Sequence, residues 1–482
     1  MISKKLSDLL ASFSKKEIKR FGEFLRSPYH NRQKYVTYFF EAIVPYYPSF
    51  SAPELQKERV FDVLYPNKSY NDTRMRNLTS DLLALAEKFT AQQQFENDRV
   101  SGQVYLLETL PARELDKMFE RKFGRFFGAV RGESAKNEID YLDRLRLLEA
   151  RSIYVNRRKT NDAKANFECY QGIVNETIKF FLASLFKNYS IILNKETTFF
   201  KYEYDTRFID TIIWYMEGVI SEYEEDTCIM LYYYFCLFYR NYDEQSFKAL
   251  EKFTFDNFNK LDKHDLLNAI TNMSNYCRRQ ALAGKAGFEV RALNLFKLAL
   301  NENLWNEQNK IRPNIFRGIV STAGNAGEIE WCENFIQAYS GLQPPEHIAS
   351  NTLLARGRLC FDKKDYPAAI EYLSKVQPVD ATYKYETDTL MIRIYYELNE
   401  IESYFDRVKS FKKWIKNNKT KISARYRATF SEMAAYFERL MQLKLEPDEF
   451  RLKKMVQEIS ENELLVNRLW FLKKLEAFNG VN

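Results

Sequence analysis

Glycine and proline are scarce in this chain of 482 residues, which holds 15 of the first and 12 of the second. Together they take up about half the share that they have in an average domain. These residues supply the tight turns that join short strands, so their scarcity argues against a β-sandwich. Long helices with short connections are expected instead.

Cysteine and histidine are also rare and scattered. None of the six cysteines stands in a CxxC pair, and none of the three histidines has a cysteine or a second histidine at ligand spacing. This pattern predicts free, mostly buried thiols in a reducing compartment rather than a disulfide framework. It gives no reason to expect a metal site or a cofactor. The cysteines are Cys169, Cys228, Cys236, Cys277, Cys332 and Cys360.

A long hydrophobic run is missing as well. The longest apolar run, from Cys228 to Tyr239, rises about 18 Å as a helix, which is short of the roughly 30 Å of a bilayer core. The N-terminal segment has neither the apolar stretch nor the cleavage site of a signal peptide. The sequence therefore predicts a cytoplasmic protein with no membrane partner.

The chain has no strong excess of either charge. It holds 72 basic and 65 acidic residues, and the net charge of +7 is weaker than that of a dedicated nucleic-acid binder. Apolar residues make up 45% of the chain, which is enough for a buried core and excludes global disorder. The aromatic share of 16% suits the seams between helices or the anchors of an interface.

Helical patterns begin near the N-terminus. Ser14 and Glu17 form a capping box, and the helix that follows is expected to end before Pro28. Asn71 or Asp72 is expected to cap a long helix whose apolar residues recur every three or four positions as far as Phe89. Further helices are expected at Gln33–Tyr46, Pro53–Pro66, Leu115–Val130, Glu138–Tyr154 and Phe167–Leu193.

From about residue 206 the pattern changes to paired helices separated by short turns. These turns follow one another at spacings of 36 to 43 residues, a period that is typical of a helical solenoid. The predicted turns are Arg240-Asn241, Gly284 to Gly287, Gly324 to Gly327, Lys363 to Asp365, and Asn399-Glu400.

The second helix of each predicted pair carries a small residue, an apolar residue four positions later and another three positions after that. One hairpin cannot bury such a face alone, so neighbouring hairpins are expected to stack. The four instances are Ser246-Leu250-Phe253, Ala292-Phe296-Ala299, Cys332-Ile336-Tyr339 and Ala369-Leu373-Val376.

One unit resembles a known repeat. Residues 351–376, NTLLARGRLCFDKKDYPAAIEYLSKV, are similar to a tetratricopeptide repeat, because Gly357 and Ala369 stand twelve apart like the small positions of the two family helices. The DYPAAIEY run also matches the start of the second family helix. The unit after residue 400 departs from the family by placing Arg407 at an apolar position. The resemblance implies an α-solenoid that binds a protein or peptide.

The sequence thus predicts an all-α fold, a tetratricopeptide-like array of helical hairpins preceded by an N-terminal helical domain. We expect an N-terminal helical domain at 1–98, a connecting region of long helices at 99–205, the repeats at 206–445 and capping helices at 446–482. No catalytic motif is present: GxSxG, HExxH, GxGxxG and a phosphate-binding loop are all missing. The predicted function is accordingly a non-enzymatic interaction scaffold.

The most unusual local composition lies between Arg407 and Arg427, where nine basic residues occur without an acidic one. Such a concentration of charge either binds an anionic partner or forms a solvated helix end whose cations complement the helix dipole. Ile401, Tyr404, Val408, Phe411 and Ile415 are expected to form the buried stripe of this helix. The candidate binding residues are Lys409, Lys413, Lys416, Lys419, Lys421, Arg425 and Arg427.

An alternative function rests on residues 55–89. A short helix ending in LYP and the capped helix after it resemble the last two helices of the winged-helix domain in bacterial transcriptional activators with tetratricopeptide-like repeats. The resemblance implies nucleic-acid contacts by Arg74, Arg76 and Asn77. Only Val100 to Val104 offers a candidate strand for the wing. This alternative describes a nucleic-acid-binding transcriptional regulator.

Overall fold

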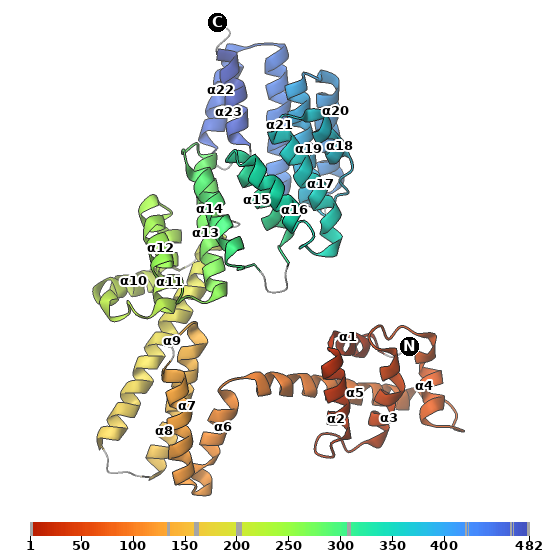
Figure 1. Cartoon of the computed structure of the whole chain (residues 1–482), viewed down its shortest axis with the longest axis vertical. Coiled ribbons are helices and arrows are strands. Elements are labelled where there is room, and N and C mark those ends of the chain that lie inside the picture. The colour runs from red at the N-terminus through yellow and green to blue at the C-terminus, as the bar shows by residue number, and fades with distance from the viewer. Residues whose placement is uncertain are drawn as a thin grey trace. The chain divides into compact units, whose positions relative to one another are not determined.

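The computed structural model describes residues 3–132, 135–158, 163–198, 205–305, 310–419, 424–462 and 467–479, together with Ile422 and Leu465. Within these ranges the chain forms 23 α-helices and no strand (Figure 1), which confirms the prediction of an all-α fold. None of the helices in these ranges is long and apolar enough to cross a bilayer. The six cysteines carry free thiols, five of them buried, as predicted.

The contacts divide the chain into two compact units, Met1–Leu182 and Ala183–Asn482. The boundary at Leu182 falls inside the long helix α9. The expected finer division at residues 98, 205 and 445 stays a prediction. The helices of the first unit, with α9 continuing into the second, are α1 (Lys4–Ser12), α2 (Lys15–Arg26), α3 (Lys34–Ile43), α4 (Lys57–Leu64), α5 (Asp72–Asn97), α6 (Ser101–Thr109), α7 (Asp116–Arg131), α8 (Glu138–Arg158) and α9 (Ala163–Thr198).

The first core of unit 1 joins α1 to α5. The predicted capping box starts α2, because the Ser14 hydroxyl accepts from the Glu17 backbone and the Glu17 carboxylate accepts from the Ser14 backbone. Asn71 caps α5 in the same way by accepting from the backbone of Arg74. A cluster of phenylalanine rings fills the space between these helices: Phe13, Phe21, Phe24, Phe40 and Phe89.

The second core of unit 1 lies between α6, α7, α8 and part of α9. Its centre includes the stacked rings of Phe119 and Tyr154, whose centroids are 4.0 Å apart. The segment proposed as a wing strand, Val100 to Val104, forms the start of α6 instead. Val104 is buried, and the Ser101 hydroxyl accepts from the Arg146 side chain, so packing against α8 and a local hydrogen bond stabilise the helix. The wing prediction is therefore wrong.

The second unit continues from α9 with paired helices. They are α10 (Arg207–Val219), α11 (Thr227–Asn241), α12 (Glu244–Asp256), α13 (Lys263–Leu282), α14 (Phe288–Asn301), α15 (Pro313–Asn325), α16 (Ile329–Tyr339), α17 (Pro345–Asp362), α18 (Tyr366–Ser374), α19 (Ala381–Leu398), α20 (Ile401–Asn417), α21 (Ala424–Leu445), α22 (Glu449–Glu461) and α23 (Arg468–Asn479).

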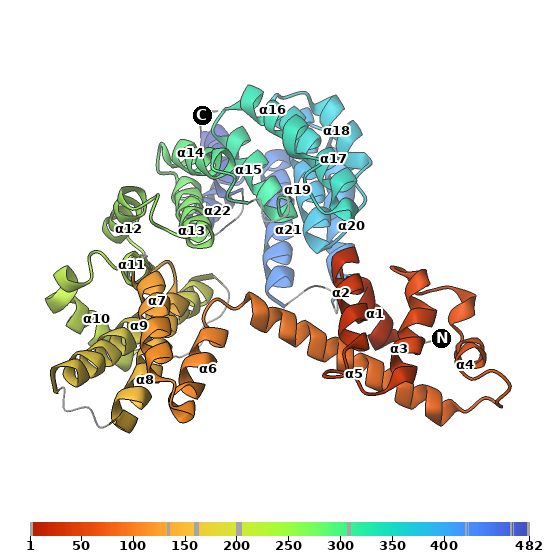
Figure 2. The same ribbon diagram turned by 60° about the horizontal axis from the view of Figure 1, so that its bottom comes forward.

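From α11 to α20 each helix packs against the next helix in sequence. The five predicted turns fall at the ends of α11, α13, α15, α17 and α19, so these five are the first helices of hairpins. The second helices are α12, α14, α16, α18 and α20. The first helices α15, α17 and α19 contact one another in turn (Figures 1 and 2). Of the twelve residues in the predicted second-helix pattern, only Phe253 and Tyr339 are not fully buried.

Two helices of a hairpin approach each other closely at the contact between α17 and α18. A Cβ added to Gly357 would lie 2.7 Å from two side-chain carbons of Leu373 and 3.5 Å from the carbonyl of Ala369. Ala369 and Leu373 are themselves buried. The twelve-residue spacing of Gly357 and Ala369 therefore marks a real contact, in which small side chains let two backbones come together.

The C-terminal hairpin α22–α23 packs back on earlier first helices. The Phe471 ring of α23 lies 5.0 Å from that of Phe437 in α21, and Trp470 donates to Glu397 of α19 at 3.1 Å. At the start of α23, Arg468 donates to the carbonyl of Leu282 at the end of α13. The chain end thus joins helices that lie far apart in the sequence.

The contact at Gly357 can be tested by Gly357→Ala. The added Cβ should lower the free energy of unfolding of unit 2 by about 1–3 kcal/mol, because Leu373 must leave its place. All five tryptophans lie in this unit, so urea unfolding followed by tryptophan fluorescence reports on it.

The matched control is Gly218→Ala in α10, where an added Cβ meets nothing within 4 Å. It should leave stability unchanged or raise it by up to about 1 kcal/mol, because alanine favours a helix. Equal losses in both variants would contradict the close approach of α17 and α18.

Candidate functional site

The first helices α15, α17 and α19 carry polar side chains along one face. Residues four or seven apart on a helix lie on the same side, one above the other. We call this set the polar face. It comprises Arg317, Ser321 and Asn325 of α15, Asn351, Arg358 and Asp362 of α17, and Thr382, Glu386, Arg393 and Glu397 of α19.

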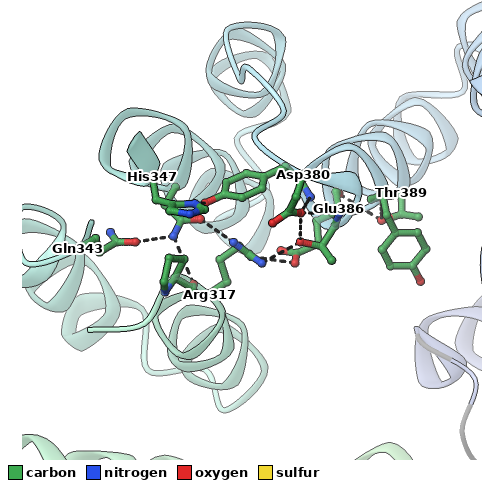
Figure 3. A network of polar contacts seen from close by, with 11 residues as sticks. Arg317, Gln343, His347, Asp380, Glu386 and Thr389 are labelled. Atoms are coloured by element: carbon green, nitrogen blue, oxygen red, sulfur yellow. Dashed lines mark hydrogen bonds and ion pairs between the residues drawn. The ribbon is translucent and has the colours of Figure 1, made fainter. Parts of the chain in front are cut away.

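Arg317 connects the three helices (Figure 3). Its Nε lies 2.9 Å from Oε1 of Glu386, while Nη1 donates to Asn351 and Nη2 donates to Thr382, both at 3.0 Å. The guanidinium also stacks over the ring of Tyr383, 4.4 Å from its centroid. One planar side chain with five donors can satisfy such divergent partners, whereas a lysine cannot.

A second layer of hydrogen bonds orients these partners. Asn351 donates to Gln343 and to the carbonyl of Pro313. Asp380 is the N-cap of α19, and its carboxylate accepts from the hydroxyl and the backbone of Thr382. His347 lies 2.8 Å from the Tyr383 hydroxyl. Arg317 therefore meets partners whose positions are already set, which reduces the entropy lost on pairing.

The Arg317–Glu386 pair lies where water still reaches. The Arg317 side chain is 10% exposed and that of Glu386 is 36% exposed. Desolvation by the surrounding helices raises the pKa of Glu386, and the Arg317 guanidinium opposes this shift. The pair thus lines a partly desolvated surface, where a further polar group would interact more strongly than on an open helix.

A second ion pair lies further along the polar face. Arg358 contacts Asp362 at 2.9 Å and donates to Asn325 of α15 at 2.7 Å. Gly324 allows this arrangement, because any Cβ there would overlap the Asp362 carboxylate. The α15–α17 seam is therefore held by Arg358 as well as by Arg317.

Arg393 is the most enclosed cation of the polar face. Its guanidinium lies 4.3 Å from the ring centroid of Phe361 and donates to Asn467, which precedes α23. Burial and the neighbouring Arg358 lower the pKa of Arg393, but a guanidinium still keeps its charge at neutral pH. Because α23 covers Arg393 and Glu397, the accessible part of the polar face lies around Arg317, Ser321 and Glu386.

One further cation extends this accessible part. Arg278 of α13 is half-buried, and its Nη1 lies 3.5 Å from the position of a Cβ on Gly318. Burial lowers the pKa of Arg278 and the charge of Glu386 opposes the shift. Among the described residues Arg278 forms no ion pair. The site therefore offers donors from Arg278 and Arg317 and acceptors from Glu386.

The described side chains of this arrangement supply hydrogen-bond donors and acceptors. No group of three or more histidine, cysteine or acidic side chains in the described ranges is placed to hold a metal ion. Cys277 and Cys332 are buried, and burial raises the pKa of each thiol to about 12, so neither is a ready nucleophile. What remains are fixed hydrogen-bond donors and acceptors that could pair with a polar ligand.

The predicted basic residues occupy α20, the turn after it and the start of α21. Lys409, Lys413, Lys416 and Lys419 are exposed and form no ion pair among the described residues. Lys421 lies outside the described residues, and so does the side chain of Arg425. Of the predicted set, the structure brings Lys416, Lys419 and Arg427 together around one cavity.

Two other cations of this segment are neutralised by acids distant in sequence. Arg407 contacts Asp388 of α19 at 3.2 Å, and Lys412 pairs with Glu438 of α21. Arg407, where the family pattern would place an apolar residue, thus forms an ion pair. The expected stripe of α20 is buried except at Ile401, which begins the helix and is 37% exposed.

The residues of the alternative function lie in the first two turns of α5. Arg76 pairs with Asp72 at 2.8 Å, and the Arg74 guanidinium lies 4.9 Å from the ring centroid of Tyr65. Asn77 is exposed. Nucleic-acid contacts by these residues stay a prediction, and both arginines already have partners within the unit.

The polar face itself is absent from the sequence predictions. Its members are separated by up to 80 residues, and their common position follows only from the stacking of α15, α17 and α19. The available signal was the four- and seven-residue spacing of the polar residues at positions 382, 386, 393 and 397 of α19. That spacing marks one side of α19, but it does not identify the helices that face it.

Asp388 provides a test of the electrostatics beside this site. Its side chain is fully buried between Lys384 and Arg407, and desolvation raises the pKa of Asp388 above its ordinary 3.8. At pH values between 3.8 and the raised pKa, the native state then binds more protons than the unfolded state. The contribution of Asp388 to stability should therefore be greatest below about pH 4 and fall as the pH rises through the raised pKa.

The measurement compares urea unfolding of the wild type and of Asp388→Asn across this pH range. The stability of the wild type relative to the variant should decline with rising pH, by on the order of 1 kcal/mol for each unit of pKa shift. Glu402→Gln, which removes an exposed carboxyl from the next helix, is the matched control for the loss of one acid. A flat difference for Asp388→Asn would show that burial does not disfavour its charge.

Comparison with protein-family models, with curated proteins and with solved structures finds no match to this chain.

Proposed function

We propose that this protein is a non-enzymatic cytoplasmic scaffold that binds a protein or peptide on the accessible part of the polar face. The observation that carries the proposal is the linkage of three first helices by Arg317, which leaves Glu386 partly exposed beside it. A stack of hairpins that holds charged groups on a shared surface suits the recognition of another chain.

The proposal includes a tetratricopeptide-like solenoid in unit 2. Two observations support it: the serial packing of α11 to α20, and the close approach of α17 and α18 at Gly357. The step from such an array to protein binding is an inference from the kind of fold. The chemistry of the polar face supplies the more specific argument.

A polypeptide ligand fits this chemistry. A peptide backbone presents donors and acceptors in alternation, and the accessible surface offers cationic donors at Arg278 and Arg317 and acceptors at Glu386 and Ser321. Their mixed charge favours a polar peptide over nucleic acid, whose phosphates would be repelled by Glu386. Groups that are already fixed lose little entropy when the ligand binds.

Site-specific photo-cross-linking tests this proposal. A photoreactive phenylalanine analogue placed at Ser321, one turn beyond Arg317 on α15, should cross-link to a polypeptide in the native cell. The same analogue at Gln337, exposed on the second helix α16, should not. Arg278→Glu should reduce the cross-link from position 321 by about tenfold, because a lost charge-assisted hydrogen bond costs about 1.5–3 kcal/mol.

The identity and position of the cross-link decide the outcome. One polypeptide captured from position 321, absent at 337 and reduced by Arg278→Glu, supports the scaffold. Recovery of nucleic acid from position 321 would favour the regulator instead. Equal capture from both positions would contradict recognition by the polar face.

A further inference from the structure

A separate cationic cavity lies between α20 and α21. Its volume is about 320 Å³, and no carboxylate is among its described lining residues. Four of the six described lining side chains are cationic. The lining consists of Lys412, Ile415, Lys416, Lys419, Arg427 and Ser431.

Three of the four cations form no ion pair among the residues that the structure describes. Lys412 pairs with Glu438, which lies on α21 outside the lining. Lys416 and Lys419 are exposed and form no ion pair among the described residues. Arg427 donates from Nη1 to the carbonyl of Lys419 at 3.3 Å, a neutral partner that orients the guanidinium and leaves its charge available.

The position of the cavity beside α21 adds to the positive electrostatic potential of these cations. Arg427 lies in the first turn of the 22-residue helix α21, and Ser431 lies one turn further on the same side. The cavity therefore lies beside the helix end whose dipole favours an anion. Lys416 and Lys419 approach from the end of α20, so cations from two helices converge on one place.

We propose that this cavity binds a phosphate monoester on a serine or threonine side chain of a partner polypeptide. A phosphate monoester carries close to two negative charges and three acceptor oxygens, which match the uncompensated cations better than a carboxylate with one charge does. The Ser431 hydroxyl offers a further donor, and Ile415 offers apolar surface to the carbon atoms of the phosphorylated residue.

A nucleic-acid strand fits less well. Each phosphodiester carries one charge, and proteins that hold single strands combine basic side chains with exposed aromatic rings. No aromatic side chain is among the described lining residues, and the nearby Trp414 packs against Phe411 and Phe430 instead. This proposal does not depend on the polar face, which lies on other helices.

Phosphorus NMR of the full chain tests the proposal with a defined probe, an end-blocked Gly-phosphoserine-Gly peptide. Its phosphorus resonance should broaden on addition of the protein. Lys416→Glu should weaken the fitted affinity by roughly tenfold or more, since a charge-assisted hydrogen bond is lost. Lys409→Glu makes the same change in net charge on α20 but lies outside the cavity, so it should leave the affinity nearly unchanged.

Three further probes separate the sources of the phosphate. Inorganic phosphate and a short single-stranded oligonucleotide should bind more weakly than the peptide, and a Gly-Glu-Gly peptide should not compete with it. Tighter binding of inorganic phosphate or of the oligonucleotide would overturn the assignment to a phosphorylated polypeptide. Equal losses in Lys416→Glu and Lys409→Glu, or no broadening at all, would mean that these lysines only complement the end of α20.

Discussion

The second unit depends on the burial of more apolar surface than any of its hairpins can cover alone. The second helices present residues such as Ala292, Phe296 and Ala299, which are almost completely buried. A first helix of the same pair covers only part of this surface, so the next hairpin must cover the rest. At Gly357 the requirement becomes steric, because Leu373 occupies the volume that any side chain would need. Stacking is thus a consequence of packing rather than of any single polar contact.

Stacking in turn determines where polar residues can lie. Once the apolar sides of α15, α17 and α19 are buried, the remaining side of each helix faces the same surface, and Arg317 finds Asn351 and Glu386 there. A charge held among helices is costly unless it is paired and hydrogen-bonded. The Arg317 network satisfies that condition, whereas Arg278 has no ion pair among the described residues. An unpaired charge costs less on a surface that binds a polar ligand than in a closed core, because the ligand can pair with it.

The sequence predicted the local features of this fold well, because their causes are local. The capping box at Ser14, the cap of α5 at Asn71 and the five inter-hairpin turns each depend on residues within a few positions of one another. The candidate site could not be predicted in the same way, since Arg317 and Glu386 are 69 residues apart. The wing prediction at Val100 failed for the related reason that packing against α8 outweighs the strand preference of a five-residue segment.

The basic segment from Arg407 to Arg427 also shows why the number of charged residues in a segment does not identify a binding site. The nine cations of this segment cannot be told apart from the sequence, because none has an acidic residue beside it within the segment. In the structure Arg407 pairs with Asp388 and Lys412 pairs with Glu438, so acids from neighbouring helices neutralise these two cations. The described lysines that remain exposed differ again, because Lys416 and Lys419 converge with Arg427, whereas Lys409 and Lys413 lie outside the cavity. A cation matters for recognition through the charges that surround it in space. Since the acids that neutralise one part of the segment leave the other part uncompensated, folding itself converts a uniform basic run into one localised cationic cavity.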